Sequence, residues 1–260
     1  NVTLIELSNL LGQVNRGKAV ETRLLIGFCM LVPRKVFDKV GLLDEGLFLG
    51  NDDLELSWRL RQNGYKLLVA TDTFVHHEGQ VSFKSEPESR TSKLVQESTD
   101  CLFASLEAHY GKGKVPSPME LWGIDWFKPT RAVFRSVSPT TGSKLTSIIV
   151  LTHNGLEITR ACLISIESHT PQRHELIIVD NNSTDGTLDF LRGYATAHDN
   201  VYVLANAENR GFAAGNNQGL ALARGEYVLL LNNDTVVTSD WLARMLAVFE
   251  RHPKVGIVGP

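Results

Sequence analysis

Carboxylates and amides follow apolar runs at two places in the second half of this sequence. "LLLNNDTVV" puts Asn232, Asn233 and Asp234 directly after a run of apolar residues. "IIVDNNSTDGT" puts Asp180 in the same position after another run. A carboxylate at a strand end can bind a metal ion or accept hydrogen bonds from ribose hydroxyls and nucleobase edges. The same residue types also form turns and cap helices, so each motif alone leaves both interpretations open.

A second group of ionisable residues lies in the first third of the chain. "NDDLELSWRLRQNGY" carries Asp52, Asp53 and Glu55 at the start of an amphipathic pattern. Acids in a first turn are favoured by the helix dipole, so capping is one interpretation. The next predicted strand ends at His76 and His77, and imidazole with carboxylate is a suitable ligand set for a divalent metal. Adjacent side chains of a strand point to opposite faces, so we expect at most one histidine to bind.

The elements that must position these residues are clearest in the second half of the chain. Strands are predicted at residues 145–154, 174–183, 200–209 and 226–234, alternating with helices at 156–169, 186–198 and 212–225. Apolar strands interleaved with helices indicate an α/β fold with a mostly parallel sheet covered on both faces. In such sheets ligands bind beyond the carboxyl ends of the strands, where the polar residues listed above are expected.

The first half of the chain is less regular. We expect a strand leading into a short helix over residues 22–41, a helix over 52–65, a strand over 66–79 and a helix over 89–110. Residues 112–145 are rich in Gly, Pro, Lys and Ser without a sustained period, which predicts a linker or a wrapping arm. Its aromatic side chains Trp122, Trp126 and Phe127 could dock on a surface.

Composition excludes several classes of protein. The 260 residues carry a net charge of −3 with no basic stripe, so we expect no nucleic-acid partner. Cys29, Cys101 and Cys162 show no CxxC spacing, which favours reduced packing residues in a cytoplasmic protein. No apolar run approaches the ~20 residues of a membrane span. "NRGFAAGNNQGLALARG" is neither a G-x-G-x-x-G fingerprint nor a P-loop, which argues against a Rossmann-type oxidoreductase.

Several motifs together resemble one enzyme family. "SIIVLTHN", "ELIIVDNNSTDGT", "NRGFAAGNNQG", "GEYVLLLNNDTVV" and "VGIVGP" resemble, in order, the nucleotide-binding half of the inverting family-2 glycosyltransferases with the GT-A fold. "GFCMLVPRKVFDKVGLLDE", "GNDDLELSWRLRQNGY" and "FVHHEGQ" resemble the acceptor-binding half. The resemblance covers nearly the whole chain except the predicted linker, and it implies a GT-A-type sheet with helices on both faces.

The resemblance also implies roles for individual residues. Thr152, Asn154 and Asp180 fall where the family holds the donor's base and ribose. Residues expected around the diphosphate are Asn182, Arg210 and Asn216.

The metal and the base are implied in the same way. Asp234 falls on the last position of the family's Asp-x-Asp metal motif, whereas Asn232 occupies the first, which leaves one carboxylate there. His76 or His77 would supply a further ligand. Asp53 falls on the catalytic base, Asp52 just before it and Glu55 on a nearby acidic position.

These roles define an expected reaction. A base of ordinary pKa takes the proton of the acceptor hydroxyl, and Mn²⁺ or Mg²⁺ neutralises the leaving diphosphate. The expected donor is a UDP- or dTDP-type sugar, and the expected acceptor is a glycan or a lipid-linked glycan of surface polysaccharide synthesis. The expected location is the cytoplasm, peripheral to the inner membrane.

The order of the two halves departs from the family. The nucleotide half comes first in the family, whereas here residues 1–111 resemble the acceptor half, 112–145 form the linker and 146–260 resemble the nucleotide half. The chain therefore resembles an excerpt of two tandem modules or a circularly permuted domain. An unpaired half would expose a sheet edge and an apolar face, so we expect one composite body, with a half-exchanged dimer as its variant.

A non-catalytic module that binds nucleotide sugars is the main alternative. The two halves could derive from different active sites, and Asn232 weakens the metal site. Turnover of a donor sugar separates the two hypotheses.

Overall fold

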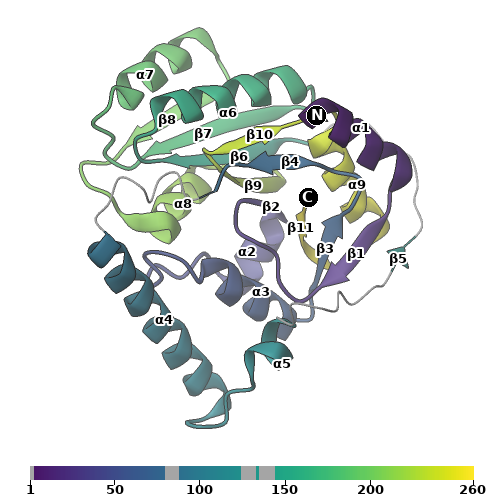
Figure 1. Ribbon diagram of the computed structural model, residues 1–260, viewed down its shortest axis with the longest axis vertical. Helices are drawn as coiled ribbons and strands as arrows, with labels where there is room; N and C mark the ends of the chain where they lie inside the picture. The colour runs from purple at the N-terminus through teal and green to yellow at the C-terminus, as the bar shows by residue number, and fades with distance from the viewer. Residues whose placement is uncertain (1–2, 80–87, 124–132, 135–143) are drawn as a thin grey trace.

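A large mixed sheet forms the centre of the protein in the computed structural model, which describes residues 3–79, 88–123, 133–134 and 144–260 (Figure 1). Its strand order is β5-β1-β3-β11-β2-β9-β6-β7-β8, and β10 pairs with β4 in a small second sheet. The strands are β1 (Ala19–Thr22), β2 (Cys29–Pro33), β3 (Lys66–Ala70), β4 (Val75–His77), β5 (Val133–Phe134), β6 (Thr146–Thr152), β7 (His174–Asp180), β8 (Val201–Ala205), β9 (Tyr227–Asn232), β10 (Thr235–Val237) and β11 (Val255–Gly259). Within the large sheet as described, β1 and β2 run opposite to the other strands, so the predicted mostly parallel α/β fold is confirmed.

Helices cover both faces of this sheet. They are α1 (Leu4–Val14), α2 (Arg34–Val40), α3 (Asp52–Gln62), α4 (Glu88–Tyr110), α5 (Pro118–Trp122), α6 (Leu156–His169), α7 (Thr187–Ala197), α8 (Gly211–Leu222) and α9 (Trp241–Arg251). One core cluster joins the sheet to α6, α7 and α9, and a second joins it to α2, α3 and α8. Figure 1 shows α4 and α5 extending below α3, away from the sheet.

The two faces explain why the central strands read as continuous apolar runs. In β6, Ile148 and Val150 belong to one cluster while Ile149 belongs to the other. Both sets are fully buried. Because each face packs on helices, apolar residues are favoured at successive positions of the strand rather than at alternate ones.

Strands from the two halves of the chain lie side by side in the large sheet. β2 lies between β9 and β11, and its register with β9 runs from Cys29 opposite Leu231 to Pro33 opposite Tyr227. β4 pairs with β10 through His77 opposite Thr235. Residues far apart in sequence therefore share one core and one sheet edge within a single chain.

The structure differs from the sequence prediction at residues 66–79. The predicted single strand is two strands, β3 and β4, because a turn interrupts it, in which Thr73 N donates to Ala70 O over 3.0 Å. β3 joins the large sheet, whereas β4 leaves it to pair with β10.

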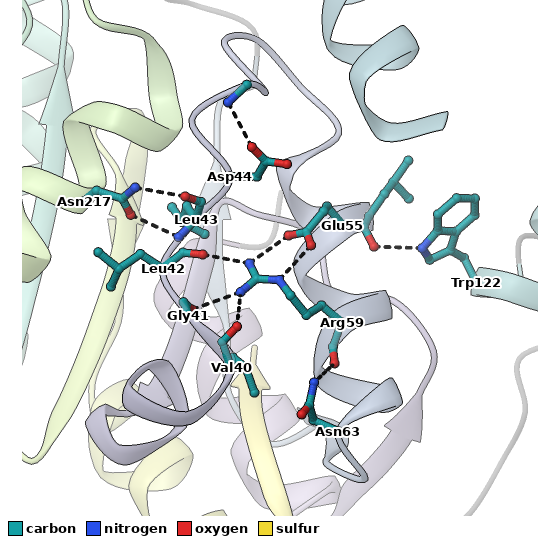
Figure 2. A network of polar contacts seen from close by, with 12 residues as sticks. Val40, Gly41, Leu42, Leu43, Asp44, Glu55, Arg59, Asn63, Trp122 and Asn217 are labelled. Carbon is teal, nitrogen blue, oxygen red and sulfur yellow. Dashed lines mark hydrogen bonds and ion pairs between the residues drawn. The ribbon is translucent and has the colours of Figure 1, made fainter. Parts of the chain in front are cut away.

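The predicted linker is also partly structured. It contains α5, which begins with a capping box between Ser117 and Glu120. Trp122 is buried in a small cluster between α3 and α4, and its indole Nε1 donates to Leu54 O over 2.9 Å (Figure 2). Trp126 and Phe127 lie outside the described residues.

Across the described ranges, none of the helices combines the length and the apolar character that crossing a membrane requires.

Candidate active site

A cavity of about 450 Å³ opens at the carboxyl ends of β6 and β9. The start of α8 forms one wall, and residues of α4 and of the 48–49 segment form another. Its lining consists of Phe48, Leu49, His77, Gly79, Arg90, Thr91, Leu94, Leu151, Thr152, His153, Asn181, Asn209, Gly211, Phe212, Asn232, Asn233 and Asp234. Both halves of the chain contribute to it, at the sheet edge where the sequence predicts ligand binding.

Asp234 and His77 meet at this edge although they come from opposite halves of the chain. The pairing of β4 with β10 brings His77 Nε2 to 3.1 Å from Asp234 Oδ1. Glu78 N donates to Asp234 O over 2.9 Å and anchors the same junction. His76 points elsewhere, with its Nε2 3.2 Å from Glu78 Oε1. The structure thus distinguishes the two histidines that the sequence left open.

Two carboxylate oxygens at this edge are buried: Asp180 Oδ1, which accepts no hydrogen bond within the described chain, and Asp234 Oδ1, whose polar neighbour is the His77 imidazole. Asp180 is fully buried and Asp234 is 5% exposed. Buried polar atoms normally have hydrogen-bond partners, so the bare Asp180 Oδ1 marks a position that a ligand can complete.

A divalent cation fits the pair of His77 and Asp234 only with help from further ligands. Among the described residues there is no group of three His, Cys, Asp or Glu side chains suited to hold a metal. Asn232 lies beside the pair, with its Nδ2 3.5 Å from His77 Nε2. Mg²⁺ and similar cations are commonly bound by one or two protein ligands together with substrate phosphates, and this arrangement suits such a site.

Asn233 has a structural role. Its Nδ2 donates to Thr159 Oγ1 over 3.0 Å and to Thr152 Oγ1 over 3.3 Å. These bonds hold the turn between β9 and β10 against β6 and α6. The "NND" motif can therefore both form a turn and bind a ligand, because Asn233 stabilises the turn while Asp234 lies beside His77.

The residues expected to bind the base and ribose lie at the ends of β6 and β7. Thr152 lines the cavity and is the register partner of Asp180. Asp180 Oδ2 accepts from Ser183 N over 3.0 Å, which leaves Oδ1 for a ligand. Asn154 Oδ1 instead accepts from Thr184 N over 2.8 Å, so this side chain stabilises the loop.

The three residues expected around the diphosphate do not line the described cavity. Asn182 and Arg210 are exposed, and Asn216 donates to the carbonyl of Phe212 in its own helix over 2.9 Å. Two glycines of the small-residue run have a packing role, because a Cβ on Gly215 or Gly219 would lie 2.4 Å or 2.6 Å from side-chain atoms of β6.

An amide network that the sequence analysis did not identify lies beneath the cavity. Asn181 Nδ2 donates to Gly211 O over 3.1 Å, and its Oδ1 accepts from Asn206 over 2.8 Å. His153 Nδ1 lies 2.7 Å from Asn181 O. The run of Asn residues after β7 and β8 was a visible signal, but it reads equally well as turn chemistry.

Asp52 and Asp53 stand in the first turn of α3 and do not line the described cavity. Burial and, next, the neighbouring carboxylate of Asp53 raise the pKa of Asp52 to about 7. Burial also raises the pKa of Asp53, opposed by hydrogen bonds from the backbone N–H groups of Leu54 and Gly27. The sequence analysis expected a base of ordinary pKa, whereas the pKa values of both Asp52 and Asp53 are raised.

Glu55 belongs to a structural ion pair. Its carboxylate accepts from Arg59 Nε over 2.7 Å and from Nη2 over 2.8 Å. Arg59 also donates to the carbonyls of Val40, Gly41 and Leu42 (Figure 2). Glu55 thus orients the guanidinium that holds residues 40–42 against α3.

The second half of the chain is similar to a known family. Residues 147–260 match the family described as "Glycosyl transferase family 2". The match begins in β6 and runs to the end of β11, so Asp180 and Asp234 both lie in the matched segment.

Individual relatives extend the similarity. Protein y4gI of Sinorhizobium fredii is 31% identical over 248 residues, covering 91% of this chain and 26% of y4gI. The poly(ribitol-phosphate) beta-glucosyltransferase of Bacillus spizizenii is 34% identical over 101 residues, covering 38% of this chain and 16% of that protein. The chain therefore spans a minor part of the length of either relative.

Among solved structures, the mannosyltransferase PcManGT from Pyrobaculum calidifontis, in complex with GDP-Man and Mn²⁺, is similar over 44% of this chain and 34% of its own. The TM-score is 0.40 and the identity is 29%.

Proposed function

We propose that this chain is an inverting glycosyltransferase that moves a sugar from a nucleoside diphosphate to a hydroxyl acceptor. The observation that carries the proposal is the pair of buried carboxylates at the carboxyl edge of the sheet, Asp180 with a bare oxygen and Asp234 beside the His77 imidazole. The family match of residues 147–260 supports it, because both carboxylates lie in the matched segment.

Asp180 and Thr152 are proposed to bind the nucleoside of the donor. An ionised carboxylate accepts hydrogen bonds only, which suits ribose hydroxyls or the N–H edge of a pyrimidine. The adjacent cavity of about 450 Å³ has the size of a small-molecule site. We propose UDP- or dTDP-type donors on this basis.

His77 and Asp234 are proposed to hold a divalent cation together with the donor's phosphates, with Asn232 beside them. Bound there, Mn²⁺ or Mg²⁺ would supply positive charge to the leaving diphosphate. The protein's own contribution is to keep an imidazole nitrogen and a carboxylate oxygen 3.1 Å apart at the sheet edge.

Asp53 is proposed as the general base that takes the proton of the acceptor hydroxyl. Burial raises its pKa, so its carboxylate binds a proton more strongly than an exposed aspartate does. Asp52 is buried beside Asp53 and has a pKa of about 7. Near neutral pH a large fraction of Asp52 is therefore protonated and cannot accept a proton.

The acceptor and the architecture belong to the same proposal. The Bacillus spizizenii relative is named for poly(ribitol-phosphate), a polymer, and the acceptor proposed for this chain is likewise a hydroxyl of a larger molecule, a glycan or a lipid-linked glycan. The alignment with y4gI includes residues of both halves in the order found here, so this order of the halves recurs in a second protein. A half-exchanged dimer and a cytoplasmic location beside the inner membrane stay predictions.

Ligand-dependent stability tests the donor site. UDP at ~100 times its Kd should stabilise the protein by about 2.7 kcal/mol. At about 2–4 °C per kcal/mol, the melting temperature should rise by roughly 5–10 °C. GDP and dTDP, each with and without Mn²⁺, are the comparison ligands. If none of the nucleotides shifts the melting temperature, the proposed donor site is wrong.

Turnover separates an enzyme from a binding module. The non-catalytic alternative has a specific observation in its favour, because Asn232 leaves Asp234 as the single carboxylate of its motif. Hydrolysis or transfer of a UDP-sugar by the parent protein, lost in Asp53→Asn, would establish the enzyme. Nucleotide binding without any turnover would favour the module.

A further inference from the structure

We infer that the turn Gly27-Phe28 is a positioning element that orients both the proposed base and the proposed cation ligand. The inference rests on the proposed function, because it concerns the residues assigned there. The two residues precede β2, the strand of the first half that lies between β9 and β11.

Phe28 contacts the proposed cation site in two ways. Its ring stacks on the imidazole of His77, with centroids 4.8 Å apart and planes inclined by 10°. Its carbonyl accepts a hydrogen bond from Asn232 N over 2.9 Å. One half-buried residue thus touches the imidazole and also holds the end of β9, two residues before Asp234.

The stack limits how the His77 ring can turn. A ring held by a parallel neighbour keeps its plane, and in this plane Nε2 lies 3.1 Å from Asp234 Oδ1. Groups that orient a metal-binding histidine typically change metal affinity or activity about 10–100-fold when they are removed. Phe28 is placed to orient the His77 imidazole through the contact between the two rings.

Gly27 contacts the proposed base. It lies directly against the first turn of α3, where Asp53 stands. A Cβ at this position would lie 3.3 Å from Asp52 Oδ2 and 3.6 Å from Asp53 Cβ. The segment is itself fixed to α3, because Leu25 N donates to Ser57 Oγ over 3.2 Å. Glycine therefore allows the backbone to approach the acid pair closely.

The turn contacts three elements of the site at once. Asp53 comes from α3, His77 from β4 and Asn232 from β9, and the two adjacent residues Gly27 and Phe28 lie against all three. A displacement of the turn would move the base and the cation ligand relative to each other. Replacing one of its residues should therefore lower turnover more than it lowers nucleotide affinity.

Variants of Phe28 test the inference directly. Phe28→Leu keeps apolar volume and removes the ring, whereas Phe28→Tyr keeps the ring. Phe249→Leu is the matched control, because Phe249 is also half-buried and packs on Tyr227 at the opposite end of β9. Each variant is titrated calorimetrically with UDP alone and with Mn²⁺ in the presence of saturating UDP, and melting curves confirm that it folds.

We expect Phe28→Leu to bind Mn²⁺ about 10-fold more weakly and to lose kcat, with UDP affinity in the absence of metal unchanged. Phe28→Tyr should keep the Mn²⁺ affinity and kcat of the parent, and so should Phe249→Leu. The nuclear magnetic resonance signals of the His77 ring protons should lose their ring-current shift in Phe28→Leu alone. Gly27→Ala should lower kcat while leaving the affinities for Mn²⁺ and UDP near those of the parent.

Parental Mn²⁺ affinity in Phe28→Leu, or an equal loss in Phe249→Leu, would overturn the inference. These outcomes differ from failure of the proposed function, in which the parent protein itself shows no UDP binding or no turnover. A parent that binds no Mn²⁺ would refute the cation site and with it the role of Phe28.

Discussion

Replacing Asn217 should weaken the contact between the two halves of the chain and lower the free energy of unfolding. Asn217 lies on α8 and is buried, and Figure 2 shows its amide facing Leu43 of the other half. Its Oδ1 accepts from Leu43 N over 3.0 Å, and its Nδ2 donates to Leu43 O over 2.9 Å and to Glu45 Oε1 over 3.0 Å. Asn217→Ala leaves a backbone N–H and a backbone C=O without these partners.

The magnitude follows from those two groups. Each buried polar group left without a partner costs about 1–3 kcal/mol, so the variant should lose roughly 2–6 kcal/mol of unfolding free energy. At about 2–4 °C per kcal/mol, the melting temperature should fall by on the order of 10 °C. Asn217→Asp keeps the acceptor but sets a carboxylate against Leu43 O and Glu45, so it should also be destabilised at neutral pH.

Denaturant unfolding and amide hydrogen exchange measure this effect. The matched control is Asn216→Ala, one residue earlier on the same helix, because the Asn216 side chain bonds only within α8 in the described structure. We expect the Leu43 amide to lose exchange protection in Asn217→Ala and to keep it in Asn216→Ala. If both variants lose the same stability, the reasoning that this amide joins the halves is refuted.

Four further predictions concern the site. Asp53→Asn should lower kcat by about 10²–10⁴-fold with UDP affinity preserved, measured by steady-state kinetics and calorimetry, because a base acts in the transition state. Asp180→Ala should weaken UDP binding in calorimetry; equal affinities would remove Asp180 from the nucleoside site. His77→Ala should weaken Mn²⁺ binding and His76→Ala should not, since only His77 lies beside Asp234; the reverse order would contradict the geometry. Asp52 has its pKa raised to about 7, so the folded state binds the extra proton and its stability should fall as pH rises from about 4 to about 7; in denaturation at several pH values, Asp52→Asn should flatten that fall.

The amino-acid sequence by itself predicted the elements of the second half closely. The expected helix at 156–169 has the bounds of α6, and β6, β7 and β9 lie within the expected strands. These elements are readable because burial on both faces makes each strand a continuous apolar run, a local property. Capping signals were equally local: Thr3 with Glu6 and Ser117 with Glu120 mark the starts of α1 and α5, which the sequence analysis did not predict.

Only the tertiary structure decided which of the predicted residues meet. His77 rather than His76 faces Asp234 because the register of β4 on β10 turns that side chain toward the sheet edge. Glu55 is paired with Arg59, and Trp122 fills a cluster between α3 and α4. These outcomes depend on contacts between residues far apart in the chain or on the space around a side chain. Local periodicity carries neither kind of information, because it reports which face of an element is buried and not what that face is buried against.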